Sequence, residues 1–325
     1  MTIIDRPTSA LTDPMDPRLD AYRPDPAIET RYQSRVVPGG KRDIDLLLHF
    51  WAQRDTNGYS QNVMLVGETQ SGKTMLVHVL ACRIARHLGL PRPLPVFTLS
   101  GSAGVTDYDM LGQPTAYTDP EGNERIVWLP GLVDLAARVP SLLYLDEVNM
   151  MPERVTSTLH PVCDDRRTFV NRARAISPSG GTVPGDMMPE QVAVNTGTWI
   201  IGSYNSGYRG AGALNEAFLN RFRHLPWDYD EDVEKKLIGS PAVLLLGKAL
   251  REARALRAIS TPVGTKALIN LRDDAMTLGL EAALWVFTGM FPPTERGRVQ
   301  AIIDDRSITP LLAAEVRAAT TPTTA

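Results

Sequence analysis

Short apolar runs alternate with amphipathic stretches through the middle of the chain. A helical stretch follows the first run from Met75 to Ala85, and an amphipathic helix is predicted over Ile44–Trp51. Alternation of this kind is typical of a parallel sheet covered by helices, so we predict an α/β fold with an αβα core. The runs with the length and composition of buried strands are Met64–Val66, Val96–Leu99, Leu142–Leu145 and Trp199–Gly202.

The pattern changes after Trp227. Residues 230 to about 312 lack strand signals and contain helical stretches, notably Ala242–Ala258, Val263–Leu278 and Gly279–Phe291. We therefore predict an α/β domain over residues 35–228 and a smaller all-helical domain over residues 229–312.

The two ends of the chain show little periodic apolarity. Residues 1–34 are rich in Pro and Asp, which predicts a flexible arm able to dock on a neighbour. Residues 313–325 end in Thr, Ala and Pro, and we predict a flexible tail there.

Two segments interrupt the alternation of strands and helices. The turn Asp-Pro-Glu-Gly-Asn lies within Tyr117–Trp128, whose flanks can pair as a hairpin inserted between two helical stretches. The Gly- and Pro-rich segment Ser177–Pro189 is too long for a plain connection and is interpreted as a loop.

Composition restricts the class of protein. Of 325 residues, 43% are hydrophobic and 22% are charged, as in a soluble globular protein, and the net charge of −3 predicts no bulk attraction to nucleic acid or anionic membranes. Neither a membrane span nor a signal peptide is evident, so we expect a cytoplasmic protein. The two cysteines, Cys82 and Cys163, are expected to be buried reduced thiols.

The octapeptide from Gly67 to Thr74 matches the phosphate-binding pattern G-x-x-x-x-G-K-[ST]. An apolar strand precedes it and a helix follows, so its backbone N–H groups and the helix start can surround phosphate oxygens. Lys73 would reach the β- and γ-phosphates of ATP, and the Thr74 hydroxyl would hold Mg²⁺. The predicted nucleotide-binding residues of this segment are Gly67, Glu68, Thr69, Gln70, Ser71, Gly72, Lys73, Thr74 and Met75.

The strand Leu142–Leu145 is followed directly by Asp146 and Glu147. Two carboxylates at the carboxyl edge of a parallel sheet lie where ligands of such sheets bind. We predict that Asp146 supports Mg²⁺ and that Glu147 polarises a water molecule for attack on the γ-phosphate. The alternative, a solvated pair capping the next helix, is disfavoured by the phosphate loop upstream.

Two further residues complete the predicted catalytic set. Asn205 follows the strand Trp199–Gly202 and could hold the attacking water, although an Asn after a strand is more often a turn former. Arg221 precedes Phe222 and could act as an arginine finger across a subunit boundary, although a single helical Arg is ordinarily a solvated surface residue.

Taken together in this order, these motifs resemble the AAA+ ATPases with their Walker A and Walker B elements. The chain is more narrowly similar to the MoxR-like group, and most of all to its CbbQ/NorQ branch. The strings that carry the narrower similarity are Asp109–Gly112, Val127–Leu132, His160–Pro161, Asp164–Arg167 and Ser203–Tyr208.

The resemblance implies a hexameric ring with ATP and Mg²⁺ at the subunit interfaces. Asn205 would be sensor 1, and Arg221 would act on the neighbouring subunit's nucleotide. The Tyr117–Trp128 hairpin would point toward the pore, and the segment after Phe169 would be the pre-sensor-1 hairpin. Family members remodel or activate a protein client, commonly with a von Willebrand factor A (VWA) domain partner.

One part of the chain departs from the family pattern. The family has a sensor 2 Arg in its helical domain, where this chain reads Ser-Thr-Pro-Val-Gly-Thr-Lys over residues 260–266. Lys266 is the best positional match and Arg272 is the second candidate, with a solvated surface Lys as the alternative. A lysine lacks the bidentate fork of arginine.

Three functions are compatible with these residues. The first is a ring that hydrolyses ATP to remodel a protein client. The second is a nucleic-acid motor, which the acidic balance disfavours. The third is a nucleotide-gated scaffold without catalysis, which the Asp146–Glu147 pair disfavours. The arginines that keep the second open are Arg166, Arg167, Arg172 and Arg174.

Overall fold

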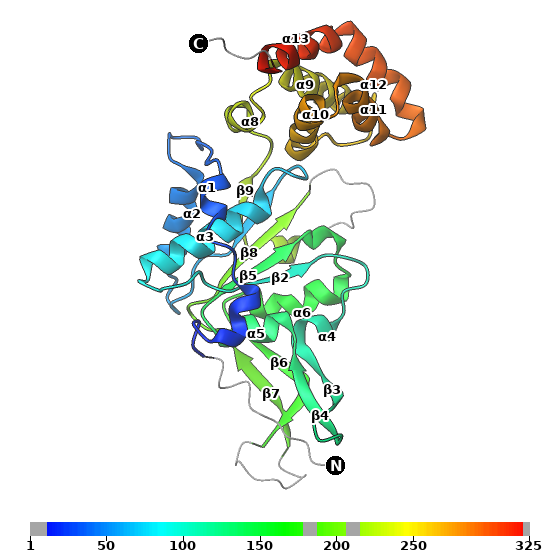
Figure 1. The fold of residues 1–325 in the computed structure, drawn as a ribbon. Coiled ribbons are helices and arrows are strands. Elements are labelled where there is room, and N and C mark those ends of the chain that lie inside the picture. The colour runs from blue at the N-terminus through cyan, green and yellow to red at the C-terminus, as the bar shows by residue number, and fades with distance from the viewer. Residues whose placement is uncertain (1–11, 178–186, 206–214, 321–325) are drawn as a thin grey trace. The chain divides into compact units, whose positions relative to one another are not determined.

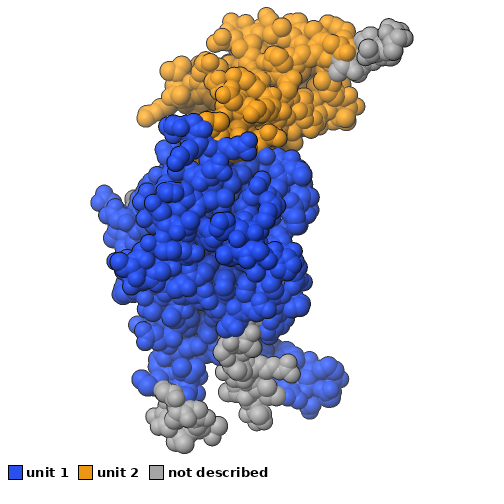
Figure 2. Space-filling model, turned by 90° about the vertical axis from the view of Figure 1, so that its left-hand side faces the viewer, with its two compact units in different colours: residues 1–32, 37–66, 72–226 blue, residues 33–36, 67–71, 227–325 orange. Residues whose placement is uncertain are grey.

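The computed structural model describes residues 12–177, 187–205 and 215–320 and separates into two compact units. Unit 1 comprises residues 1–32, 37–66 and 72–226, and unit 2 comprises residues 33–36, 67–71 and 227–325 (Figure 2). The main change of unit falls between Pro226 and Trp227. Two short segments near the N-terminal third therefore group with the C-terminal helices, which the sequence did not indicate.

A five-stranded parallel sheet forms the centre of unit 1 (Figure 1). Its strand order is β2-β5-β8-β1-β9, so the predicted parallel sheet is confirmed. The edge strand β9 was missed, because it has only four residues, two of them polar, and it ends in proline. The strands are β1 (Val63–Val66), β2 (Val96–Ser100), β5 (Leu142–Asp146), β8 (Trp199–Tyr204) and β9 (Arg223–Pro226).

Helices cover this sheet through apolar faces. The predicted helices at 44–51 and 75–85 are present as α2 (Asp43–Ala52) and α3 (Lys73–His87). Helix α3 packs on β2 and β5, and α5 (Leu132–Arg138) packs on the same two strands. The other helical elements are α4 (Asp107–Leu111), η3 (Val148–Met150), α6 (Glu153–Cys163) and α7 (Glu216–Leu219).

The core explains why these elements pack as they do. Strand β5 reads Leu-Leu-Tyr-Leu-Asp, and its first four residues are buried. Because a central parallel strand is covered on both faces, it is expected to be apolar almost throughout. Cys82 and Cys163 are both buried and unpaired, which confirms that prediction, and burial raises their thiol pKa values to about 11 and about 12.

Two antiparallel hairpins extend unit 1. The first pairs β3 (Gly112–Thr118) with β4 (Glu124–Pro130), which confirms the predicted hairpin and lengthens it at both ends. The second pairs β6 (Thr168–Ile176) with β7 (Met188–Ala193). The loop predicted over Ser177–Pro189 is therefore wrong at its end, where residues 188 and 189 are in β7, and residues 178–186 lie outside the described part.

Buried charges fasten the second hairpin to helix α5. Arg138 donates to Asp134 at 2.7 Å and to Glu190 of β7 at 2.8 Å, and Arg174 of β6 lies 3.0 Å from Glu190. The Asp134 side chain is fully buried and that of Arg174 is 6% exposed. Removing one member of such a cluster leaves an uncompensated buried charge. Ion pairs between α5 and β7 thus hold the β6–β7 hairpin against α5, and the spacing of residues in the sequence did not predict them.

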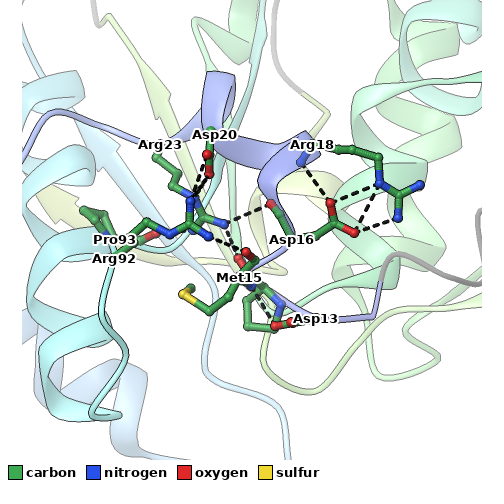
Figure 3. Close-up of polar contacts among 9 residues, drawn as sticks. Asp13, Met15, Asp16, Arg18, Asp20, Arg23, Arg92 and Pro93 are labelled. Atoms are coloured by element: carbon green, nitrogen blue, oxygen red, sulfur yellow. Dashed lines mark hydrogen bonds and ion pairs between the residues drawn. The ribbon is translucent and has the colours of Figure 1, made fainter.

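The N-terminal arm was predicted to be flexible, and this is wrong for residues 17–31. They form η2 (Pro17–Tyr22) and α1 (Ile28–Arg31), and Leu19 is buried in the core of unit 1. Figure 3 shows the polar contacts of this segment: Arg23 donates to the Pro93 carbonyl, and Arg92 pairs with Asp20 at 2.6 Å. Two apolar side chains, Leu19 and Tyr22, and the arginine–carbonyl hydrogen bonds therefore hold this segment although it lacks periodic apolarity.

Unit 2 is all-helical in the described residues from 231 onward, as predicted. Its helices enclose a separate core that includes Leu246, Leu268 and Phe287. They are α8 (Glu231–Ile238), α9 (Pro241–Ala255), α10 (Thr265–Thr277), α11 (Leu280–Gly289), α12 (Pro293–Asp305) and α13 (Ile308–Thr320). None of the helices in the described ranges is long and apolar enough to cross a membrane.

The predicted flexible tail is wrong for residues 313–320, because α13 continues to Thr320. Leu312 is fully buried, and Glu315 accepts a hydrogen bond at 2.8 Å from the backbone N–H of Ala242, at the start of α9. The Ser240 hydroxyl also donates to Glu315. A carboxylate that satisfies the unpaired amides of another helix start stabilises both helices.

Candidate functional site

The carboxyl ends of three neighbouring strands bring the predicted site residues together. Lys73 begins the helix that follows β1, Asp146 ends β5, and Asn205 follows β8. Since β5, β8 and β1 are adjacent and parallel, their carboxyl ends meet at one edge of the sheet. Glu147 follows Asp146 directly and joins the same group.

Asn205 links the lysine of the phosphate loop to the glutamate. Its Oδ1 accepts a hydrogen bond from Lys73 Nζ at 2.8 Å, and its Nδ2 donates to Glu147 Oε1 at 3.0 Å. Asn149 Nδ2 donates to the Asn205 carbonyl at 3.3 Å. Lys73 is 7% exposed and Asn205 is 8% exposed. One amide therefore aligns a buried cation and a carboxylate on either side of it.

Asp146 is bound through one of its two carboxylate oxygens. Oδ1 lies 2.5 Å from Ser203 Oγ, 2.8 Å from the Tyr144 hydroxyl and 3.1 Å from the backbone N of Glu147. Tyr144 and Ser203 are fully buried. Neither residue was predicted from the sequence. Each is a hydroxyl-bearing residue within a mainly apolar strand, and this could have indicated a polar role.

Glu147 occupies a left-handed backbone conformation, with φ of 50°. Such a conformation costs energy in a residue other than glycine and persists only where neighbours enforce it. Here the Glu147 backbone N lies 3.1 Å from Asp146 Oδ1 and 3.4 Å from Ser203 Oγ. The strained residue thus directs its side chain to Asn205.

The oxygens at this edge fit a divalent cation. Thr74 Oγ1 lies 3.4 Å from the Tyr144 hydroxyl, which in turn bonds Asp146, so the two predicted Mg²⁺ ligands share one buried neighbour. Carboxylate and hydroxyl oxygens suit Mg²⁺, which retains water and phosphate ligands rather than needing a full protein cage. Within the described ranges no cluster of three or more His, Cys, Asp or Glu residues forms a metal site.

The second half of the phosphate loop belongs to unit 1. Gly72 has φ of +88°, a left-handed conformation that glycine adopts without strain, and it caps the start of α3. Lys73 and Thr74 then form the first turn of that helix. Met75 is 37% exposed.

The first half of the loop, Gly67–Ser71, belongs to unit 2. A Cβ on Gly67 would lie 2.1 Å from the Trp227 carbonyl oxygen, so only glycine fits. The Tyr229 hydroxyl donates to the Thr69 carbonyl at 2.9 Å. Within the loop, Ser71 Oγ donates to the Glu68 carbonyl at 2.8 Å.

Two cations of unit 2 contact this half-loop. Arg35 donates to the Ser71 carbonyl at 2.9 Å, and Arg254 forms an ion pair with Glu68. Arg254 Nη1 lies 2.8 Å from Glu68 Oε1, and both side chains are about three-quarters buried. Lys266 is exposed and lines a cavity of about 310 Å³ together with Gln70. Arg272, the second candidate, donates to the Leu237 and Ile238 carbonyls at the end of α8. Arg254 was missed because nothing local distinguishes it from other arginines of α9.

Arg221 lies apart from the other catalytic candidates of its own chain. It approaches Asp164 at 3.5 Å and donates to the Ala217 carbonyl. Among the described residues it forms no hydrogen bond or ion pair with Asp146, Glu147 or Asn205. Burial and the nearby Arg221 charge lower the pKa of His160, which stacks on Phe218.

The arginines that kept the nucleic-acid motor open do not form one exposed patch. Arg167 is 5% exposed and Arg174 is 6% exposed. Arg166 is exposed and pairs with Asp164 at 2.6 Å, and Arg172 is exposed. Two of the four side chains are therefore unable to contact a phosphate backbone directly. Of the strings that suggested the narrower resemblance, residues 206–208 lie outside the described part.

Comparison with known proteins adds a family model and several relatives. A model described as an AAA domain of the dynein-related subfamily matches residues 62–222. Uncharacterised proteins of Staphylococcus epidermidis RP62A and Staphylococcus aureus USA300 are each 30% identical over 237 residues, which is 69% of this chain and 82% of theirs. The crystal structure of NtrX from Brucella abortus is 18% identical with a TM-score of 0.40; the match covers 68% of this chain and just under half, 47%, of the NtrX chain.

Proposed function

Because the chain belongs to the dynein-related subfamily of AAA domains, we propose that it hydrolyses ATP with Mg²⁺ as part of a ring that remodels or activates a protein client. The observation that carries this proposal is the hydrogen-bonded series Lys73–Asn205–Glu147. This series supports Lys73 as the phosphate-binding cation and Glu147 as the base, because Asn205 hydrogen-bonds to both side chains. The predicted P-loop AAA+ fold is the frame that positions them.

Each residue has a defined part in the proposed reaction. Lys73 would neutralise charge on the β- and γ-phosphates, and Thr74 and Asp146 would hold Mg²⁺, which would offset the charge developing on the phosphate oxygens. Glu147 accepts the proton of the attacking water, and Asn205 orients both water and Glu147. The burial of Lys73 and Asn205 strengthens their interactions because the local dielectric constant is low.

Glu147→Gln tests this assignment. The amide keeps the size and the hydrogen bond to Asn205 but cannot accept a proton, so phosphate release is expected to fall by about 10²–10⁴-fold while ATP binding persists. Glu153→Gln, at an exposed carboxylate of α6, is the control and should retain wild-type turnover. Wild-type turnover by Glu147→Gln would remove Glu147 from this role.

The proposal extends to a homo-oligomeric ring, with six subunits as in the resembling family, in which Arg221 acts on the neighbour's nucleotide. Its separation from Glu147 within one chain supports a role in trans. Glu147→Gln and Arg221→Ala should each be inactive alone. Mixed in equal amounts, they should recover about a quarter of wild-type turnover, the fraction of interfaces that receive both native residues. Absence of recovery in verified mixed rings would contradict action in trans.

The finer assignment is a MoxR-like ATPase of the CbbQ/NorQ branch that acts in the cytoplasm with a VWA-domain partner. Its support is the set of local strings and the two hairpins of unit 1. Glu147→Gln protein held in ATP should retain a partner containing a VWA domain, whereas the same protein in ADP should release it. DNA-stimulated, salt-sensitive turnover would instead favour the nucleic-acid motor.

A further inference from the structure

We propose that Tyr144 and Ser203 are positioning residues that prepare Asp146 and Thr74 for the divalent cation. This inference rests on the proposed function, since it concerns the metal of that reaction. The observation behind it is the unequal use of the two Asp146 oxygens. All of the donors near Asp146 converge on Oδ1: the Ser203 hydroxyl, the Tyr144 hydroxyl and the backbone N–H of Glu147.

The other oxygen, Oδ2, accepts no hydrogen bond from the described residues. A carboxylate held through one oxygen has its rotation fixed, and the second oxygen keeps its lone pairs for a cation. Asp146 is therefore arranged for ligation through Oδ2 alone. A cation that takes few protein ligands and keeps its water needs such a single, well-oriented oxygen.

Tyr144 joins the two predicted metal ligands. Its hydroxyl lies 2.8 Å from Asp146 Oδ1 and 3.4 Å from Thr74 Oγ1. A phenol has one proton to donate, and when this proton goes to Asp146, the phenol oxygen accepts from the Thr74 hydroxyl. Thr74 then directs its proton to Tyr144 and its lone pairs elsewhere, as a metal ligand requires.

The strand geometry explains how the tyrosine reaches both ligands. Residues two apart on a strand point to the same face, so Tyr144 and Asp146 of β5 lie on one side of the sheet. Ser203 lies on the adjacent strand β8, whose residue Gly202 pairs with Leu145. Helix α3, which contains Thr74, packs on β5. Two strands and one helix thus bring three hydroxyl groups together: those of Tyr144 and Ser203 contact Asp146, and that of Thr74 lies beside Tyr144.

A purely structural role does not account for the hydroxyl groups. A phenylalanine would fill nearly the same core volume as Tyr144, and burying a hydroxyl has a cost that only its hydrogen bonds offset. The side-chain partners of the Tyr144 hydroxyl are Thr74, Asp146 and Ser203. Every one of them belongs to the site edge, so the function of the hydroxyl lies there.

The test measures metal binding rather than turnover. The probe is Mn²⁺, followed by its electron paramagnetic resonance signal, on protein saturated with ADP. Tyr144→Phe and Ser203→Ala are each expected to weaken Mn²⁺ affinity by about tenfold to a hundredfold, the usual effect of losing a residue that orients a metal ligand. ADP affinity measured in EDTA should stay within about twofold of wild type, because these hydroxyl groups act through the metal ligands.

Tyr59→Phe is the matched control. It removes a tyrosine hydroxyl that donates to the Val194 carbonyl at 3.0 Å, away from the site edge, and it should leave Mn²⁺ affinity unchanged. Wild-type Mn²⁺ affinity in both site variants would overturn the inference. An equal loss of ADP affinity in EDTA would also overturn it, because the residues would then support the fold rather than the metal.

Two further outcomes are distinguishable. If wild-type protein binds neither ADP nor Mn²⁺–ADP, the proposed function itself fails. If Tyr144→Phe does not fold, as judged by its thermal unfolding transition, Ser203→Ala decides the question alone, since a small buried Ser-to-Ala change removes only the hydroxyl.

Discussion

The two halves of the phosphate loop are held by different parts of this protein. Gly72, Lys73 and Thr74 are grouped with the sheet, where Lys73 bonds Asn205 and Thr74 lies beside Tyr144. The residues before them are grouped with the helices of unit 2.

The preceding half, Gly67–Ser71, makes several contacts within unit 2. Arg254 pairs with Glu68, and Tyr229 bonds the Thr69 carbonyl. The side chain of Gln70 lies so close to Gly264 that a Cβ there would come within 2.4 Å of it. Gln70 itself has φ of 57°, in the left-handed region.

The two halves of the loop therefore differ in role: Gly72–Thr74 carries the groups expected to act on ATP, and Gly67–Ser71 connects the loop to unit 2. Lys73 and Thr74 supply the charge and the metal ligand of the motif. They contact Asn205 and Tyr144, which lie on or next to the strands that carry the other catalytic candidates. The residues at the variable positions of the motif, Glu68 to Ser71, contact residues of unit 2. Substitutions in Gly67–Ser71 should therefore change ATP affinity and the stability of unit 2 moderately. Substitutions of Lys73 or Thr74 should impair ATP binding or hydrolysis strongly.

The largest effect is expected for Lys73→Ala. Loss of this buried cation should weaken ATP binding by at least about 30-fold, because truncating a buried charged partner commonly costs 2 kcal/mol or more. Titration with a fluorescent ATP analogue measures the effect, and Lys248→Ala, on helix α9, is the control. Affinity equal to wild type would show that the second half-loop does not bind phosphate.

Asn205→Ala should come next and should act on turnover more than on binding. It removes the hydrogen bonds to Lys73 and Glu147, so phosphate release at saturating ATP is expected to fall by about tenfold to a hundredfold. The KM for ATP should change by less than about threefold. A reversed split, with KM rising and kcat unchanged, would assign Asn205 to ground-state binding.

A smaller effect is expected for Arg254→Ala in the first half. Glu68 would then keep an uncompensated negative charge in a loop that receives phosphate, so ATP affinity should fall by about threefold to tenfold. Adding Glu68→Gln removes that charge and should restore affinity. If the double variant binds as weakly as Arg254→Ala alone, the arginine contributes something other than neutralising Glu68.

The smallest effect is expected for Tyr229→Phe. It removes one neutral hydrogen bond to the Thr69 carbonyl, worth about 1 kcal/mol of unfolding free energy. Chemical denaturation should show this loss, and ATP affinity should change by less than about twofold. A loss of affinity comparable to that of Lys73→Ala would contradict the division of the loop into two unequal halves.

Sequence pattern predicted the strong periodic elements and failed where stability comes from few contacts. The parallel strands and the helices at α2, α3, α9, α10 and α11 follow from apolar spacing. Strand β9 did not, because its four residues gain their structure from pairing with β1. The N-terminal arm and the end of α13 were missed for a similar reason, since a few contacts hold them: Leu19 and Tyr22 pack on the core of unit 1, and Leu312 and Glu315 hold α13.

The candidate site divides in the same way. Lys73, Asp146, Glu147 and Asn205 were predicted from motifs and strand ends, and they meet at one sheet edge. The residues that hold them were missed, since a buried tyrosine or serine in an apolar strand has no local signature. Among three cations of unit 2, only the structure distinguishes Arg254 from Lys266 and Arg272.

The sequence alone determined which chemical groups this protein has and the sheet edge to which they belong. Those facts are local, because a glycine loop between strand and helix and an acidic pair after a strand encode their own geometry. The tertiary structure alone decided which oxygen of Asp146 accepts hydrogen bonds from its neighbours and that Arg254 is the ion-pair partner of Glu68. Glu68 and Arg254 are 186 residues apart, and a contact over that distance depends on how the helices pack rather than on any neighbouring residue.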